Sequence, residues 1–216
     1  MTAPEDFATT GRHWMCQALT EADLAPYDAI ANRNHGPGAR VDLGGDFGTN
    51  TPRTRGITAL FPDFHAVRAM VFNKTEANNW GVPWHQDRLI AVAARHEVEG
   101  FHNWSQKARV WHCEPPLDFL NQMLFVRLHL DPAEADSGPM EIALCSHHAK
   151  LIPSATCDAT AAAHQTELCT AQRGDILILH MLTLHRSRPA AQPSARRTLR
   201  VDFTKSALPA PLEWAA

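Results

Sequence analysis

Short segments in which apolar and polar residues alternate recur through the last two-thirds of the chain, and they restrict the possible folds. In the clearest one, MLFVRLHLD at residues 123–131, every second side chain from Leu124 to Leu130 is a branched aliphatic. Four further segments have strand patterns and are separated by turns that contain Gly, Pro or Asp: 67–74, 138–144, 174–185 and 196–205. Short strands joined in this way predict a mainly β, jelly-roll-like sandwich or barrel with helices packed on its outside.

The first 66 residues lack this alternation and predict helices and loops outside a β core at residues 67–205. Thr20 and Asp23 match a capping box that begins a helix within residues 19–34, and Pro26 is expected to confine this helix or to lie in its first turn. Residues 35–58 are rich in Gly, Asp, Thr and Asn and predict a loop. Because no linker or repeat interrupts the chain, residues 1–216 are expected to form one domain.

Composition excludes several classes of partner. The formal net charge of −3 and a pI near 6.5 provide no electrostatic footprint for nucleic acid or an acidic membrane surface. Five scattered cysteines, odd in number and without a C-x-x-C pair, favour a reducing compartment over a disulfide framework. Neither a signal peptide nor a membrane-spanning segment is recognisable. The sequence therefore predicts a cytoplasmic protein, either a monomer or a homodimer.

Three pairs of residues match half of a metal site with the spacing His-x-Asp or His-x-Glu. They are His85/Asp87, His129/Asp131 and His112/Glu114. Since the chain contains 13 His and 13 Asp, chance alone gives about one His-x-Asp. The spacing itself therefore leaves all three open.

Two imidazoles and one carboxylate are the ligands that leave coordination positions of ferrous iron open for chemistry. A third ligand would come from a distant strand, and His185 closes the long apolar segment at 174–185. His180 lies in the same segment with the opposite parity and apolar neighbours, which is more typical of a core histidine. In the last strand, Arg196 and Arg200 share a polar face that either lines a cavity or is simply solvated.

Four segments, in order, resemble the phytanoyl-CoA dioxygenase family of iron(II)- and 2-oxoglutarate-dependent oxygenases. They are FNKTEANNWGVPWHQD, RLHLDPAEADSGPMEIALCSHH, GDILILHMLTLHRS and ARRTLRVDF, which fall within residues 67–205. The family has W-H-x-D, a strand and turn ending in PGSH, a second histidine followed by x-S, and an arginine eleven residues after that histidine. The resemblance implies a double-stranded β-helix of the cupin type.

The resemblance also assigns roles. His85, Asp87 and His185 would be the catalytic metal ligands, and Arg196 would pair with the distal carboxylate of 2-oxoglutarate. Ser187 would add a hydroxyl to that pocket, and Lys74 is either a further cofactor residue or a surface lysine. Arg127 and His129 either face the cavity or lie on a solvated outer face, and Cys145 is a further residue that could lie near the cavity. Trp80 and Trp84 are more typical of packing.

The implied enzyme binds Fe(II), 2-oxoglutarate and dioxygen and hydroxylates a small organic molecule, with release of succinate and carbon dioxide. Asp87 stands where halogenating relatives have Ala or Gly, which favours hydroxylation. The family's PGSH turn is here LCSHH, and no obvious basic cluster is available for the phosphates of coenzyme A. Two alternatives remain: a metal-dependent jelly-roll isomerase or hydrolase that does not use 2-oxoglutarate, and a binding module without metal chemistry.

Overall fold

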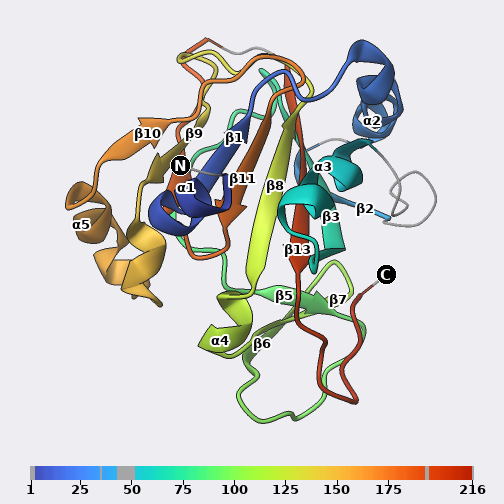
Figure 1. Cartoon of the computed structure of the whole chain (residues 1–216), viewed down its shortest axis with the longest axis vertical. Coiled ribbons are helices and arrows are strands. Elements are labelled where there is room, and N and C mark those ends of the chain that lie inside the picture. Colours follow the sequence, from blue (N-terminus) through green and yellow to red (C-terminus); the bar gives the residue numbers. More distant parts are fainter. Residues whose placement is uncertain (1–2, 35, 43–51, 193–194, 216) are drawn as a thin grey trace.

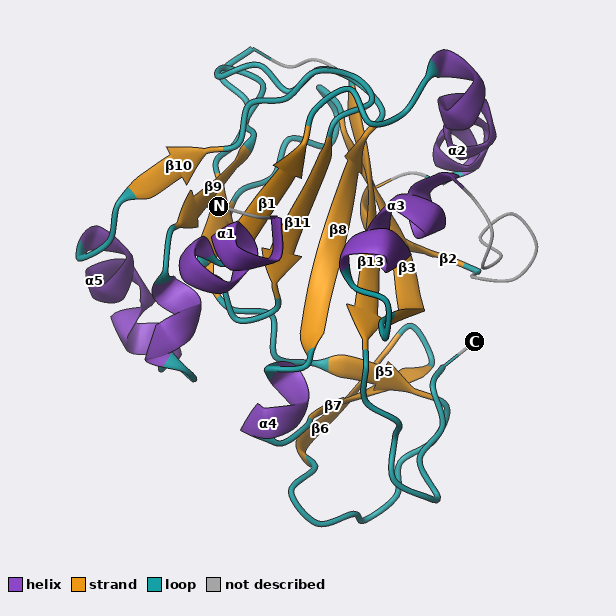
Figure 2. Cartoon of the chain, viewed as in Figure 1, coloured by secondary structure: helices purple, strands orange, loops and turns teal. Residues whose placement is uncertain are grey.

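The computed structural model describes residues 3–34, 36–42, 52–192 and 195–215. Antiparallel strands form its centre and helices lie at the periphery, as the secondary structure in Figure 2 shows. The helices are α1 (Ala3–Thr10), α2 (Glu21–Arg33), α3 (Pro52–Leu60), α4 (Leu117–Leu120), α5 (Cys157–Ala162) and the 3-10 helices η2 (Ser146–Ala149) and η3 (Ser154–Thr156). The strands are β1 (Arg12–Met15), β2 (Gly36–Val41), β3 (His65–Lys74), β4 (Val82–His85), β5 (Ile90–Val92), β6 (His102–Lys107), β7 (Val110–Glu114), β8 (Met123–His129), β9 (Met140–Ala143), β10 (Thr166–Leu168), β11 (Ile176–His180), β12 (His185–Ser187) and β13 (Arg196–Thr204).

The strands form three sheets. A six-stranded sheet has the order β1-β11-β8-β13-β3-β2, and a four-stranded sheet has the order β10-β9-β12-β4. A small third sheet, β5-β7-β6, lies at one end of the large sheet in Figure 1. Neighbours in every sheet run antiparallel, and the two larger sheets carry the predicted jelly roll.

The two faces of β13 have different surroundings, as its alternation predicts. Leu199, Val201 and Phe203 are buried in a core with residues of α2 and α3, among them Leu24 and Ile57. A second core lies between the two larger sheets and contains residues of β8, β9 and β11. The opposite face of β13 carries Arg196 and Arg200, which line a cavity. The prediction that this polar face lines a cavity is confirmed, and the solvated alternative is wrong because both arginines are buried.

The N-terminal region confirms one expectation and corrects two. Thr20 caps α2 through a complete capping box with Asp23. Pro26 does not confine the helix, which continues around it to Arg33 and buries Leu24, Tyr27, Ile30 and Ala31. Burial of this face offsets the hydrogen bond that Pro26 cannot donate. The segment expected to be a loop at residues 35–58 contains β2 and the start of α3; residues 43–51 lie outside the described residues.

The segment around His112, directly before Pro115-Pro116, has no clear strand pattern in the sequence, but it is strand β7. Val110 pairs with Lys107 across the tight turn between β6 and β7, and the sequence before Pro115-Pro116 completes the strand. Because β7 is short and alternates weakly, its pattern did not stand out in the sequence. Among the described residues, no helix is long and apolar enough to span a membrane.

Candidate metal centre and cofactor cavity

Two strands of the four-stranded sheet bring the three predicted ligands together. His85 is the last residue of β4 and His185 is the first of β12, and these two residues face each other in the strand register. Asp87 follows β4 after one intervening residue. The pairing of β4 with β12 therefore joins ligands that are a hundred positions apart in the sequence.

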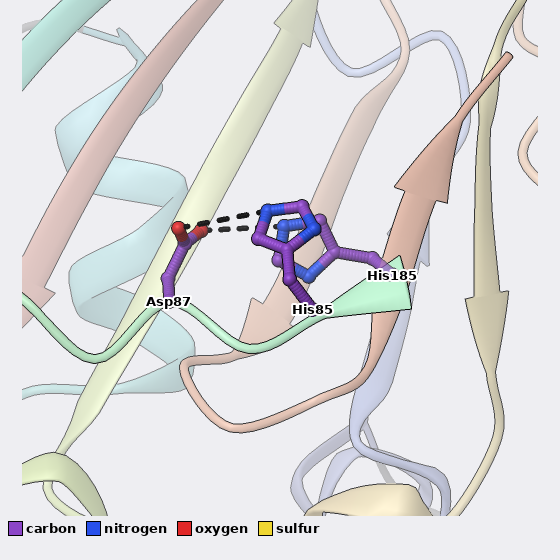
Figure 3. A group of neighbouring side chains, drawn as sticks. All are labelled: His85, Asp87 and His185. Atoms are coloured by element: carbon purple, nitrogen blue, oxygen red, sulfur yellow. Dashed lines mark ion pairs between the residues drawn. The ribbon is translucent and has the colours of Figure 1, made fainter. Parts of the chain in front are cut away.

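The side chains of His85, Asp87 and His185 converge on one point, as Figure 3 shows. The Nε2 atom of His85 is 3.9 Å from Oδ1 of Asp87, and Nε2 of His185 is 3.3 Å from Oδ2 of Asp87. The ligand atoms of the three residues all lie within 4.8 Å of one another, which is close enough for one metal ion. Among the described residues, this is the one group of histidine, cysteine and carboxylate side chains with such geometry.

Backbone contacts set the orientation of both imidazoles. Nδ1 of His85 lies 2.8 Å from the carbonyl oxygen of Pro83, and Nδ1 of His185 lies 2.9 Å from that of Thr183. Since a carbonyl only accepts, each Nδ1 carries the proton and donates it. Each Nε2 therefore presents a lone pair toward the other two ligands, as a metal-binding histidine requires.

The charges at the three residues suit a metal. Burial and the neighbouring His185 lower the pKa of His85 to about 4, so its imidazole is neutral at pH 7. The pKa of Asp87 lies well below its usual range: burial opposes this shift, but Arg200 and His185 outweigh it. Asp87 is therefore a carboxylate at pH 7, and one carboxylate with two imidazoles that present their Nε2 atoms forms the donor set that ferrous iron accepts.

Arg200 has a contact with Asp87 that the sequence did not reveal. Its Nη1 donates to Oδ2 of Asp87, and its Nε donates to Asp202 at 2.6 Å. Asp202 in turn accepts from Nε of Arg68 at 2.6 Å. This chain of alternating charges fixes the Asp87 carboxylate from the side of β13. The only feature of the sequence that pointed to these contacts was the polar residue at every second position of β13.

Gln86, between His85 and Asp87, anchors this segment to the backbone of neighbouring loops. Its Nε2 donates to the carbonyls of Leu182 and Lys150, each at 2.7 Å, and its Oε1 accepts from the backbone N–H of Ile152 at 2.9 Å. Three hydrogen bonds from one side chain hold the loop between His85 and Asp87 in place. Nothing in the sequence distinguished Gln86 from a solvated residue.

A cavity of about 770 Å³ opens beside the three ligands. Volumes of about 300–1,000 Å³ are usual for small-molecule sites. The cavity is lined by all three ligands and also by Ser187, Arg196 and Arg127. Phe72, Met70 and Met140 contribute apolar walls. Trp80 lines the cavity too, whereas Trp84 is packed in a small buried core, as expected.

Arg196 and Arg127 are buried cations without a carboxylate partner among the described residues. Nη2 of Arg196 donates to the carbonyl of Gly138 at 2.8 Å, while its Nε makes no hydrogen bond. Burial lowers the pKa of Arg196 to about 10 and, together with Arg196 and Arg200, that of Arg127 to about 9. Unpaired buried cations are costly, so a ligand that carries negative charge would complete this part of the cavity.

Lys74 is buried, with 1% of its surface exposed, so the alternative of a surface lysine is wrong. It faces Arg196 in the strand register, and its Nζ donates to the carbonyl of Arg188 at 2.7 Å and, at 3.3 Å each, to Ser187 Oγ and the Gly138 carbonyl. Burial, Arg196 and Arg127 lower the pKa of Lys74 to about 8. Lys74 does not itself line the cavity; it supports Ser187 from behind.

Gly138 accepts hydrogen bonds from three of these side chains and is required at its position. Its φ is +64°, and a Cβ there would lie 2.5 Å from the carbonyl oxygen of Arg188 and 2.8 Å from Lys74 Nζ. A side chain at 138 would therefore collide with the backbone at Arg188 and with Lys74, which lie behind the cavity lining. The Ser-Gly-Pro segment of the sequence thus shapes the region around Arg196.

The remaining candidates lie away from the ligands. His129 is buried at the end of β8, stacked on Trp14 and in contact with the carbonyl of Asp175 at 3.3 Å, and it is not a cavity residue. His180 packs against His147 and Phe7 near α1, as expected for a core histidine. Glu114 pairs with Arg88 rather than with His112. Cys145 is outside the cavity lining and adopts a left-handed φ of 64°, where the family pattern has glycine.

Three solved structures illustrate the fold similarity. The α-ketoglutarate-dependent epimerase SnoN from nogalamycin biosynthesis is 14% identical with a TM-score of 0.64, covering 94% of this chain and 80% of its own. AviO1 from Streptomyces viridochromogenes Tue57 is 20% identical with a TM-score of 0.61, covering 97% and 96%. HygX from Streptomyces hygroscopicus, solved with nickel and 2-oxoglutarate, is 12% identical with a TM-score of 0.59, covering 94% and 86%.

Comparison with curated protein sequences finds no match. The family model of phytanoyl-CoA dioxygenase (PhyH) matches residues 57–198, about two-thirds of the chain. This span includes the three candidate ligands, Ser187 and Arg196. The chain therefore belongs to the phytanoyl-CoA dioxygenase family, whose members are iron(II)- and 2-oxoglutarate-dependent oxygenases.

Proposed function

We propose that this protein is an iron(II)- and 2-oxoglutarate-dependent dioxygenase that hydroxylates a small organic molecule. One observation carries the proposal: a His-Asp-His group suited to ferrous iron shares a cavity with Arg196 and Arg127, two cations that form no ion pair with any described carboxylate. His85, Asp87 and His185 would hold the metal. The chemistry that iron supplies when bound is the coupling of 2-oxoglutarate decarboxylation, to succinate and carbon dioxide, with oxidation of the substrate by dioxygen.

Residues in and around the cavity have defined tasks in this proposal. Arg196 binds the distal carboxylate of 2-oxoglutarate through its planar guanidinium, and Ser187 offers a hydroxyl beside it. Lys74 holds Ser187 and adds positive charge behind both. The backbone carbonyls of Pro83 and Thr183 keep the ligand imidazoles in the metal-binding tautomer. The apolar walls limit access of water to the reacting atoms.

The choice of hydroxylation rests on family chemistry and on the carboxylate at position 87. Among the structural neighbours, SnoN is described as an epimerase and SnoK, from the same biosynthesis, as a carbocyclase, both dependent on α-ketoglutarate. Hydroxylation predicts a product that is heavier than the substrate by one oxygen atom. A product of unchanged mass would instead indicate epimerisation, and one lighter by two hydrogen atoms would indicate ring closure. The five unpaired cysteines fit a cytoplasmic location for this enzyme.

The deciding experiment is an anaerobic titration of the metal-free protein with ferrous iron and 2-oxoglutarate, followed by visible absorption. Chelation of iron by the keto acid gives a weak charge-transfer band, so no substrate is required. We expect the band in the wild type, a weaker band in Arg196→Ala, and an unchanged band in Arg197→Ala, whose side chain lies on the opposite face of β13. Iron binding without a band would favour the metal-dependent isomerase or hydrolase.

A further inference from the structure

Arg127 of β8 is a buried cation of the cavity. It lines the cavity, and only 7% of its surface is exposed. Its Nε makes no hydrogen bond, and no carboxylate of the described chain forms an ion pair with its guanidinium. Several other lining arginines do have such a partner: Arg68 and Arg200 pair with Asp202, Arg88 with Glu114, and Arg186 with Glu141. Because an unpaired buried cation is costly, an anionic ligand is expected beside Arg127.

The groups around Arg127 do not supply that anion. The acidic groups that act on it electrostatically are Cys169 and Asp87. Burial raises the pKa of the Cys169 thiol, which is therefore neutral at pH 7. Asp87 already pairs with Arg200 and is a candidate metal ligand. The hydroxyl of Thr198, on the cavity side of β13, makes no hydrogen bond either. The donors of Arg127 are thus available to a ligand in the cavity.

The strand register places the guanidinium of Arg127 close to Arg196. Strand β8 lies beside β13 in Figure 1, and Arg127 faces Arg200 across this pair. Its guanidinium carbon lies 5.5 Å from the centre of the Phe72 ring, which belongs to β3 on the other side of β13. The side chain of Arg127 therefore crosses β13. Phe72 faces Thr198, which is two residues from Arg196 on the same face of β13.

The electrostatic effect on Arg127 agrees with this position. Burial lowers its pKa, and the charge of Arg196 is the next largest cause. Two guanidiniums from neighbouring strands are therefore close together in a region that is largely removed from water. One anion between them would offset their mutual repulsion.

A single carboxylate suits both guanidiniums. Its two oxygens offer about four lone-pair sites, so it can accept hydrogen bonds from two arginines at once. Part of the donor set of Arg196 is occupied, because its Nη2 donates to the carbonyl of Gly138 at 2.8 Å. A second guanidinium on the β8 side would therefore complete the contacts of a carboxylate bound at Arg196.

We propose that Arg127 is a second anchor of 2-oxoglutarate, which binds the distal carboxylate from β8 while Arg196 binds it from β13. This inference rests on the proposed function and adds a determinant of co-substrate choice. A keto acid that ends in a methyl group would leave both cations desolvated and unpaired. The pair of arginines therefore selects keto acids that carry a second carboxylate.

The test compares two keto acids that differ only at the distal end. 2-Oxoglutarate and 2-oxopentanoate have the same chain length and both chelate iron, but 2-oxopentanoate ends in a methyl group. Each is titrated anaerobically into the iron-loaded protein and followed by the charge-transfer band. We expect Arg127→Gln to weaken the binding of 2-oxoglutarate about 10- to 50-fold, and to leave that of 2-oxopentanoate within about twofold of the wild type. Arg127→Lys, which keeps the charge but not the planar fork, should show the same selectivity with a smaller loss.

Lys107→Gln is the matched control. Lys107 also lines the cavity, so its replacement removes the same charge, but it lies exposed at the turn between β6 and β7. This variant should bind both keto acids as the wild type does. The rise in Tm with nickel reports on folding and on the metal site, and we expect the same rise in Arg127→Gln as in the wild type. If Arg127→Gln does not fold, the comparison of the two keto acids is made with Arg127→Lys.

Three results would overturn the inference. Equal losses for the two keto acids would place Arg127 at the metal-chelating end, and no loss for either would exclude it as an anchor. The same loss in Lys107→Gln would show an effect of overall charge rather than of contact. Absence of the band with either keto acid in the wild type is a separate outcome, which would refute the proposed function itself.

Discussion

Replacement of Arg196 by methionine should stabilise the protein and remove its response to 2-oxoglutarate. Burial lowers the pKa of Arg196 from 12.5 to about 10. At about 1.4 kcal/mol per pH unit, holding this charge in the folded state costs about 3 kcal/mol at neutral pH, where the group is protonated in both states. The lost hydrogen bond to Gly138 offsets about 1–2 kcal/mol. We expect a net gain of about 1–2 kcal/mol in the free energy of unfolding.

The assay is urea denaturation with and without 2-oxoglutarate, in the presence of nickel as a redox-inert metal. A concentration one hundred times the Kd adds about 2.7 kcal/mol to the wild type. It should add almost nothing to Arg196→Met, so the variant is the more stable protein without the keto acid and the less stable one with it. A variant that is less stable in both conditions, or that responds like the wild type, would show that Arg196 is a structural cation.

The neighbouring Arg197 provides the matched control. It lies on the other face of β13 and pairs with Asp131 at 2.7 Å and Asp28 at 2.9 Å, and hydrogen bonding to Asp131 raises its pKa. Arg197→Met should therefore lose stability, by about 1 kcal/mol for a partly exposed pair, while its stabilisation by 2-oxoglutarate stays that of the wild type. Opposite effects of the same substitution at adjacent positions would confirm the different environments of the two arginines.

Three further predictions concern the metal, the pH dependence of stability and the tight turn between β6 and β7. His185→Ala should abolish both 2-oxoglutarate turnover and the rise in Tm with nickel, whereas retention of either would argue against the ligand assignment. Burial lowers the pKa of His129 to about 3 and of His180 to about 4, so the unfolded chain gains protons below about pH 6.5 while the folded chain does not. The free energy of unfolding should consequently fall between pH 6.5 and 4, by about 2 kcal/mol for each histidine at pH 5, and urea denaturation of His180→Gln should show a shallower decline. Ala108→Gly should raise stability by about 0.5–1 kcal/mol because glycine adopts the left-handed φ without strain; an unchanged midpoint in the same assay would count against a strained turn.

Local alternation was sufficient to predict the parts of the fold that are buried on one face. Leu199 and Val201 on one side of β13 and Arg196 on the other were separable in the sequence because successive side chains of a strand point to opposite faces of the sheet. The ligand set also followed from residue type, order and family resemblance, and the structure brings the three side chains together.

Features that depend on strand pairing, or on contacts with residues far away in the sequence, were not predictable. Lys74 was placed as readily on the surface as in the site, because only the folded chain supplies the carbonyls of Gly138 and Arg188 that hold its ammonium. The sequence showed no basic cluster, yet Arg40 and Lys107, 67 positions apart, line one cavity. A cluster that forms across sheets leaves no local pattern. Pro26 likewise breaks a local rule within a helix that tertiary packing stabilises.

The contact between Arg200 and Asp87 also bears on how the protein survives shortage of its metal. In many small metalloproteins the ligands repel one another or remain unsatisfied without the ion, so loss of metal is loss of the fold. Here Arg200 pairs with Asp202 on β13 and also with the carboxylate of Asp87, and the imidazole of His85 is neutral at pH 7. The Asp87 carboxylate therefore has a charge partner before any metal binds, and we expect the metal-free chain to keep its fold and to take up iron without refolding.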